Sequence, residues 1–219
     1  FPFFELSICS LAASRLQPPQ QGDLALAERY FNQAESICAP DNARLWGIRL
    51  CGPMLFADPV TRTVVANQSD VQGYLKKDGN VFVGKLPAEV NIANTAMRWA
   101  GVKWTMIMWL LPANEHRRAR LMLHELFHRI QDELGLPASS PTNNHLDTLA
   151  GRIWLQLEWR ALAAALSKTG EDGKRALEDA IVFRQYRRSL FENSEVTERG
   201  LEMNEGLSEY TGVKLRGTP

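Results

Sequence analysis

Two histidines that could share a metal ion lie four residues apart in the stretch His124-Glu125-Leu126-Phe127-His128. On an α-helix, residues at this spacing point to the same side, so both imidazoles can bind one ion. Glu125 then lies beside the ion without being a ligand, where its carboxylate can take a proton from water. Zinc held by imidazoles keeps a position open for water and lowers the pKa of that water to about 7. The spacing therefore predicts a hydrolytic zinc site carried by one helix.

One protein ligand is still missing from such a site. A longer motif with a third histidine is excluded, because its positions hold other residues, Gln131 among them. A glutamate from a later helix is the alternative, and the candidates are Glu205 in "MNEGLSEYTG" and Glu158 in "LQLEWRAL". Glu158 lies on an apolar helix face, where a carboxylate is costly unless it binds a metal or pairs with Arg152 or Arg160.

The two motifs together resemble those of the gluzincin metallopeptidases, the zinc peptidase group that includes thermolysin and the aminopeptidase N type. The resemblance rests on His124-Glu125-x-x-His128, followed later by Asn204-Glu205-Gly206-Leu207-x-Glu209-Tyr210. It implies a peptidase that uses Zn²⁺, with Glu205 as the third ligand and Glu125 as the general base. It also implies that Glu209 orients a zinc histidine. Tyr210, one turn from Glu205, is a candidate to stabilise the oxyanion, and His145 is a second candidate.

The resemblance also implies how a substrate binds. In gluzincins an edge strand beside the zinc helix holds an extended peptide through backbone hydrogen bonds. The corresponding strand here is residues 102–109, within "GVKWTMIMWLLP". A peptide or protein substrate along this strand is the expected partner. No preference for particular side chains follows from the resemblance.

The elements that position these residues form two groups along the chain. Between residues 45 and 112, short apolar runs separated by Gly, Pro, Asp and Asn predict strands, most of them joined by hairpins and therefore antiparallel. After Pro112 the pattern is helical, and Asn114 can cap the helix that carries the two histidines. The strands are expected within 45–51, 53–59, 61–68, 80–86 and 101–112, and the helices within 114–135, 146–167, 171–191 and 194–212.

This order of strands followed by helices is typical of an α+β protein. We expect a zincin-like domain over residues 23–219, with a mostly antiparallel sheet in its β-rich part (45–112) and the zinc helix in its α-rich part (113–216). Residues 1–22 are expected to form an N-terminal extension or linker.

Composition limits the possible partners. The 25 basic and 25 acidic residues cancel, so no overall positive field favours nucleic acid. No apolar run reaches the length of about 20 residues that spans a membrane. Cys38 and Cys51 can form a disulfide, which would suit a secreted or periplasmic protein, or they can remain free thiols like Cys9.

Three other interpretations of the motif stay open at this point. The site could hydrolyse a non-peptide amide or ester by the same chemistry. It could instead be a zinc-stabilised binding module without catalysis, in which the fourth coordination position is closed. The third alternative is a metal-free helical protein with a chance motif.

Overall fold

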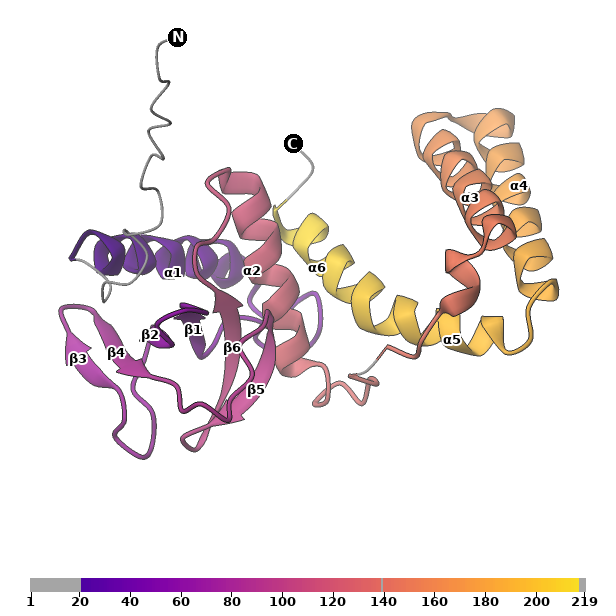
Figure 1. Ribbon diagram of the computed structural model, residues 1–219. Coiled ribbons are helices and arrows are strands. Elements are labelled where there is room, and N and C mark those ends of the chain that lie inside the picture. The colour runs from indigo at the N-terminus through magenta and orange to yellow at the C-terminus, as the bar shows by residue number, and fades with distance from the viewer. Residues whose placement is uncertain (1–20, 139, 217–219) are drawn as a thin grey trace, which may run out of the picture. The chain divides into compact units, whose positions relative to one another are not determined.

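The computed structural model describes residues 21–138 and 140–216, and they form two compact units (Figure 1). Residues 21–135 together with 208–216 make up the first unit, and residues 136–207 make up the second. The first contains a mixed sheet and the second is helical, so the class is α+β, as the order of elements predicts. The sequence predicts one domain over residues 23–219. In the structure, residues 136–207 pack mainly among themselves and form a separate compact unit.

The sheet of the first unit has six strands in the order β3-β4-β2-β1-β6-β5. Neighbouring strands are antiparallel except β1 and β6, which run parallel, so the sheet is mostly antiparallel but mixed. The strands are β1 (Met54–Ala57), β2 (Thr63–Ala66), β3 (Lys76–Asp78), β4 (Val81–Lys85), β5 (Thr95–Trp99) and β6 (Val102–Met108).

Successive side chains of the central strands point to opposite faces of the sheet, and side chains on both faces are buried. Phe56 of β1 stacks on Phe31 of helix α1 (Gln21–Asp41), with ring centroids 4.4 Å apart. Its neighbour Leu55 points to the opposite face, into a cluster with Trp104 and Met106. Successive strand residues point to opposite faces, so this apolar run fits a strand covered on both sides.

The run at residues 45–51, predicted as a strand, forms turns and irregular chain instead. The carboxylate of Asp41 accepts a hydrogen bond from the backbone N–H of Leu45, and Gly47 has a φ of 73° that suits a turn. Cys51 forms a disulfide with Cys38, which resolves the choice between a disulfide and free thiols for this pair. Cys9 lies outside the described residues. Strands β3 and β5 are additional to those predicted.

Helix α2 (Glu115–Ile130) carries the two histidines and packs against β5 and β6. The side chain of Asn114 accepts a hydrogen bond from the backbone N–H of Arg117 at 3.0 Å, so the predicted cap is confirmed. This cap satisfies one of the backbone donors that a helix start leaves without an intrahelical partner. The helix buries Met122, Leu123, Leu126, Phe127 and Ile130.

Helix α6 (Leu207–Arg216) returns to the first unit and lies close to α2. Thr211 accepts a hydrogen bond from the indole of Trp46 at 3.0 Å, and Arg216 pairs with Glu115 at 3.0 Å. A Cβ atom on Gly212 would lie 3.0 Å from the backbone oxygen of Arg120. The approach of the two helices therefore depends on a glycine at this position.

The second unit is built on a hairpin of two helices, α3 (Leu149–Ser167) and α4 (Gly170–Ser189). The ring of Trp154 on α3 lies 4.4 Å from that of Tyr186 on α4, measured between centroids. The 3₁₀ turn η2 (Asn144–Asp147) precedes the hairpin, and α5 (Ser194–Leu201) and the π turn η3 (Glu202–Gly206) follow it. The sequence predicts one helix over residues 194–212, and the structure has α5, η3 and α6 in succession there.

None of the helices in residues 21–138 and 140–216 combines the length and the apolar character needed to cross a bilayer.

Candidate metal centre

The imidazoles of His124 and His128 face each other on one side of α2. Their Nε2 atoms lie 3.2 Å apart. Two nitrogen ligands at the usual zinc–nitrogen distance in a tetrahedral site are separated by about 3.3 Å. The spacing of the two ring nitrogens therefore fits a tetrahedral ion held by both Nε2 atoms.

Each ring has an acceptor beside its other nitrogen. The Nδ1 atom of His128 lies 2.8 Å from the side-chain oxygen of Gln131, which is fully buried. The Nδ1 atom of His124 lies 3.6 Å from a carboxylate oxygen of Glu209. The hydrogen bond to Gln131 favours the tautomer of His128 with the proton on Nδ1, and the negative charge of Glu209 favours the same tautomer of His124. In this tautomer the Nε2 lone pair of each ring is left for a metal.

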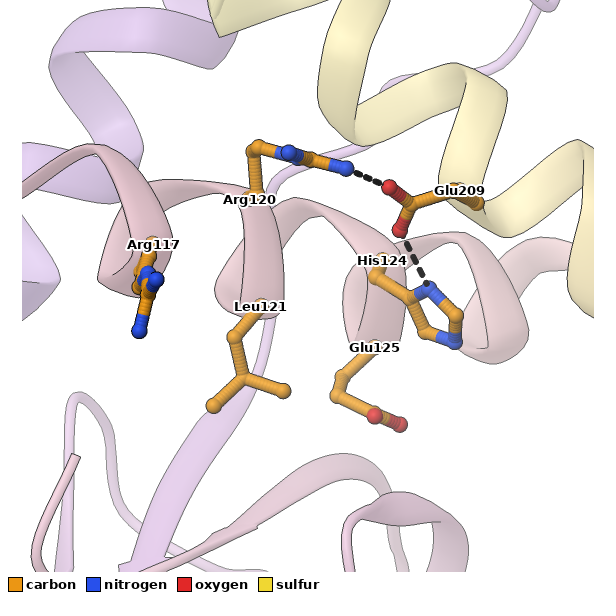
Figure 2. A pocket seen from close by; sticks show the side chains of 6 residues that line it. All are labelled: Arg117, Arg120, Leu121, His124, Glu125 and Glu209. Atoms are coloured by element: carbon orange, nitrogen blue, oxygen red, sulfur yellow. Dashed lines mark ion pairs between the residues drawn. The ribbon is translucent and has the colours of Figure 1, made fainter. Parts of the chain in front are cut away.

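Glu209 thus lies beside a histidine of the candidate site, and its role in orienting that ring for a metal stays a prediction. It also forms an ion pair with Arg120 of α2 (Figure 2). The hydroxyl of Ser208, one position earlier on α6, lies 3.2 Å from Nε2 of His124. Sequence reasoning missed Gln131 and Ser208. The signal for Gln131 was its spacing of three from His128, which places it on the same helix face.

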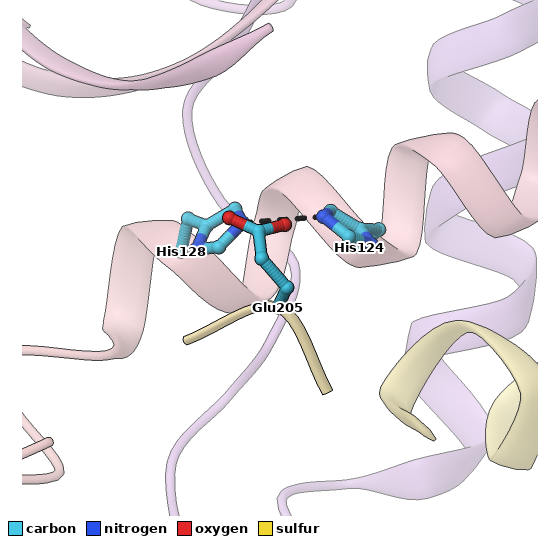
Figure 3. A group of neighbouring side chains, drawn as sticks. All are labelled: His124, His128 and Glu205. Atoms are coloured by element: carbon cyan, nitrogen blue, oxygen red, sulfur yellow. Dashed lines mark hydrogen bonds between the residues drawn. The ribbon is translucent and has the colours of Figure 1, made fainter. Parts of the chain in front are cut away.

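The carboxylate of Glu205 lies beside the imidazoles of His124 and His128 (Figure 3). One ligand atom from each of His124, His128 and Glu205 can be chosen so that all three lie within 4.8 Å of one another. Two imidazoles and one carboxylate form a donor set that catalytic zinc sites use, with the remaining coordination position open. The three residues are therefore close enough, and of the right type, to bind one ion.

Glu205 is positioned by an unusual stretch of helix. It lies in η3, where the backbone N–H of Leu207 bonds to the carbonyl of Glu202, five residues earlier. Single π turns of this kind occur frequently at functional sites. The side-chain amide of Asn204 donates to Glu205 Oε1 at 2.8 Å and to the hydroxyl of Ser140 at 2.8 Å. Asn204 of the motif thus holds the carboxylate of Glu205, the residue that follows it in the sequence.

Glu125 is buried and lines a cavity of about 250 Å³ together with His124 (Figure 2). Its side chain leaves α2 on a different side from that of His124, as the helical spacing of adjacent residues requires. A carboxylate next to the candidate metal centre and on the wall of a cavity can accept a proton from a molecule bound there.

The two oxyanion candidates have other contacts. The side chain of Tyr210 is 47% exposed, and its ring lies edge-on to Trp46 with centroids 6.4 Å apart. His145 belongs to η2, where its Nε2 atom lies 2.9 Å from a carboxylate oxygen of Glu198. Stabilisation of an oxyanion by Tyr210 stays a prediction.

Glu158, the alternative ligand, is buried among arginines of the second unit. Its carboxylate pairs with Arg187, and it accepts a hydrogen bond from Arg184 at 2.8 Å. The sequence predicts Arg152 or Arg160 as its ionic partner, and the structure has two arginines of α4 instead. Arg152 pairs with Asp147.

The strand at residues 102–109 is not at the edge of the sheet. β6 pairs with β1 on one side and with β5 on the other, so its hydrogen-bonding groups are largely used within the sheet. The edge strand next to it is β5, at the end of the strand order. The prediction that a peptide adds to residues 102–109 is therefore wrong, because β5 covers that side.

Comparison of the chain with family models, with curated proteins and with solved structures finds no match.

Proposed function

We propose that this chain is a zinc-dependent hydrolase of the gluzincin type that cleaves peptide bonds. The observation that carries the proposal is the convergence of His124, His128 and Glu205 to within 4.8 Å, with Glu125 following His124 on the same helix. The acceptors on Gln131 and Glu209 add to it, because ring orientation by an outer partner is usual for histidines that bind metals.

Each residue has a role in the proposed reaction. His124, His128 and Glu205 would hold the ion, which supplies acidification of water and polarisation of a carbonyl group. Glu125 accepts the proton of the attacking water and later passes it to the leaving amine, so that one carboxylate serves as base and then as acid. Tyr210 is the proposed donor to the oxyanion.

A peptide substrate is proposed to bind along β5. This strand ends the sheet order and packs beside α2. An edge strand presents backbone donors and acceptors that an extended peptide can pair with. The edge position and the neighbouring helix together favour β5 over β6 for this role.

Metal analysis tests the proposed centre. Protein purified without added zinc is expected to contain about one zinc per chain, as measured by elemental mass spectrometry. The His124→Ala/His128→Ala double variant should lose it, because only one carboxylate of the group remains. Metal that stays stoichiometric in the double variant would show that the ion is bound elsewhere.

Replacement of the general base tests the chemistry separately. Glu125→Gln should keep zinc and fold, and its hydrolysis of an unstructured protein should fall by at least about 100-fold. Glutamine has nearly the same shape but cannot take the proton. Peptide products are identified by mass spectrometry in matched digests. Zinc binding with no Glu125-dependent cleavage of peptides, amides or esters would instead support a binding module.

A further inference from the structure

The cavity beside α2 combines the candidate catalytic residues with positive charge. It is lined by Arg117, Arg120, Leu121, His124, Glu125 and Glu209 (Figure 2). A substrate group that enters this cavity therefore meets two guanidinium groups carried by the same helix as the proposed general base.

The two arginines differ in their surroundings. Arg120 pairs with Glu209, so its charge is compensated within the protein. Arg117 is exposed, and within residues 21–138 and 140–216 no carboxylate is in ion-pairing distance of its guanidinium. Arg117 is thus the arginine of this cavity that has no ion-pair partner among the described residues.

Arg117 is also aligned with the proposed general base. Arg117, Leu121 and Glu125 follow one another at intervals of four residues and point to the same side of α2 in Figure 2. Eight residues of helix span about 12 Å. An extended peptide covers the same distance with about three or four residues. Arg117 can therefore meet a group a few residues away from a bond held beside Glu125.

We propose that Arg117 is a specificity-determining residue that binds a carboxylate of the substrate about three or four residues from the bond that is broken. Guanidinium groups bind carboxylates through paired N–H donors, which suits a planar anion at this place. The carboxylate can be the side chain of Asp or Glu or the C-terminal group of a peptide. This inference rests on the proposed function, because it takes the site of bond cleavage to lie beside Glu125.

Binding of four matched peptides tests the proposal without turnover. The probes are dansyl-labelled alanine hexapeptides with a single Glu or a single Gln at the fourth position, each with a free or an amidated C-terminus. Fluorescence anisotropy is measured on the zinc-loaded Glu125→Gln protein at low salt. A carboxylate should tighten binding about threefold to fivefold over the amidated Gln peptide, the scale of one exposed ion pair. Tighter binding of the Glu peptides than of the Gln peptides assigns the carboxylate to a side chain. Tighter binding of the free peptides than of the amidated peptides assigns it to the C-terminus.

Two further variants, made in the same background, assign the gain to one residue. Arg117→Gln should abolish it, and Arg117→Glu should reverse the preference in favour of the amidated Gln peptide. Arg44→Gln is the matched control, because Arg44 is an exposed arginine of the same unit that does not line the cavity. It should keep the gain if the effect is local rather than a matter of net charge.

The outcomes separate this inference from the proposed function. Equal affinity for all four peptides, or a gain that survives Arg117→Gln, would overturn the carboxylate site. A gain that depends on Arg117, found together with no hydrolysis of peptides by the wild-type protein, would leave the carboxylate site in place and overturn the peptidase. Loss of the gain in the Arg44 control would also count against a local site.

Discussion

The imidazole of His128 is oriented by a side chain only three residues away on the same stretch of chain. Gln131 is fully buried, and its oxygen lies 2.8 Å from Nδ1 of the ring. For His124 the corresponding acceptor is Glu209, which comes from a different helix. The two histidines are thus held by one local and one distant contact, and the contributions of these contacts to metal binding can be separated.

Removal of the local acceptor should weaken metal binding without removing a ligand. Gln131→Met keeps the approximate size of the side chain but cannot accept the Nδ1 proton of His128. We expect zinc affinity to fall about 10- to 100-fold, the usual effect of losing an outer partner. A competition titration with a chelator measures the change, and Gln131→Glu, which restores an acceptor, is the control. Unchanged affinity in Gln131→Met would contradict the role of this contact.

The third ligand can be identified by comparing two glutamates. Glu205→Ala removes a carboxylate from the proposed ligand group, so zinc affinity should fall further than in Gln131→Met. Glu158→Ala should leave zinc affinity almost unchanged, but it removes a buried partner of Arg187 and should lower the free energy of unfolding by about 3 kcal/mol. Chelator competition and denaturant unfolding measure the two effects. Loss of zinc in Glu158→Ala together with retention of zinc in Glu205→Ala would exclude Glu205 as the ligand.

The structure brings together His124, His128 and Glu205, the three residues that the sequence proposes as ligands, but the sequence pattern does not reveal the side chains that hold them in place. A spacing of four is enough to predict that His124 and His128 share a helix face. The roles of Gln131 and Ser208 depend on the conformations of their side chains and on the course of α6, and neither is visible in a pattern of residue types. From the sequence alone, Gln131 is informative only because its residue type excludes the longer motif with a third histidine.

At the scale of elements, the position of α6 decides whether Ser208 and Glu209 reach His124. A Cβ atom on Gly212 of α6 would lie 3.0 Å from the backbone oxygen of Arg120 on α2, so the neighbour that it would meet is backbone. Backbone cannot move aside as the end of a flexible side chain can. The distance between these helices is therefore sensitive to one small residue.

A methyl group at this position should loosen the metal centre. In Gly212→Ala we expect α6 to shift by a few tenths of an ångström away from Arg120, which would move Glu209 relative to His124. Zinc affinity should fall by up to about tenfold, at the lower end of the effects of outer partners. Gly73→Ala serves as a control for general loss of stability, because Gly73 has a φ of 76° that strains an alanine although its Cβ would meet nothing within 4 Å. Equal affinity of Gly212→Ala and the wild type would show that α6 tolerates the methyl group.

Elements were predicted well where apolar periodicity is strong and poorly where other contacts dominate. Helix α2 and the central strands β1, β2 and β6 follow from apolar patterns and from the cap at Asn114. Strand β3, "KKD", is exposed throughout, so it has no apolar pattern to reveal it. The run at 45–51 has the composition of a strand, but the turn contacts of Asp41 and the disulfide of Cys51 give it another course.

At the scale of the whole molecule, the two units depend on different interactions. The first has an apolar sheet core and a disulfide. The second buries a group of charges in which Glu198 accepts hydrogen bonds from Arg187 and Arg188, and His145 lies 2.9 Å from the same carboxylate. These partners lie 10 to 53 residues from Glu198 along the chain, which is why the sequence did not predict them.

The charged group should make the second unit sensitive to acid. Burial alone would raise the pKa of Glu198, but the hydrogen bonds from Arg187, Arg188 and His145 outweigh it and lower the pKa from 4.5 to about 2. A carboxylate whose pKa is lower in the folded state stabilises the fold above its unfolded pKa, and this contribution is lost as the pH falls towards the folded value. The depression corresponds to about 3 kcal/mol, which should disappear between about pH 4.5 and pH 2.

Hydrogen exchange followed by mass spectrometry can observe this loss in the full chain. After correction for the intrinsic pH dependence of exchange, protection of α3 and α4 should decrease between about pH 4.5 and pH 2 by more than that of the strands β1 and β2. Glu198→Gln removes the titrating group, so its α3 and α4 should already be less protected at pH 6 and should change less on acidification. If protection of α3 and α4 in the wild type stays constant across this range, the buried charges do not stabilise the second unit through ionised Glu198.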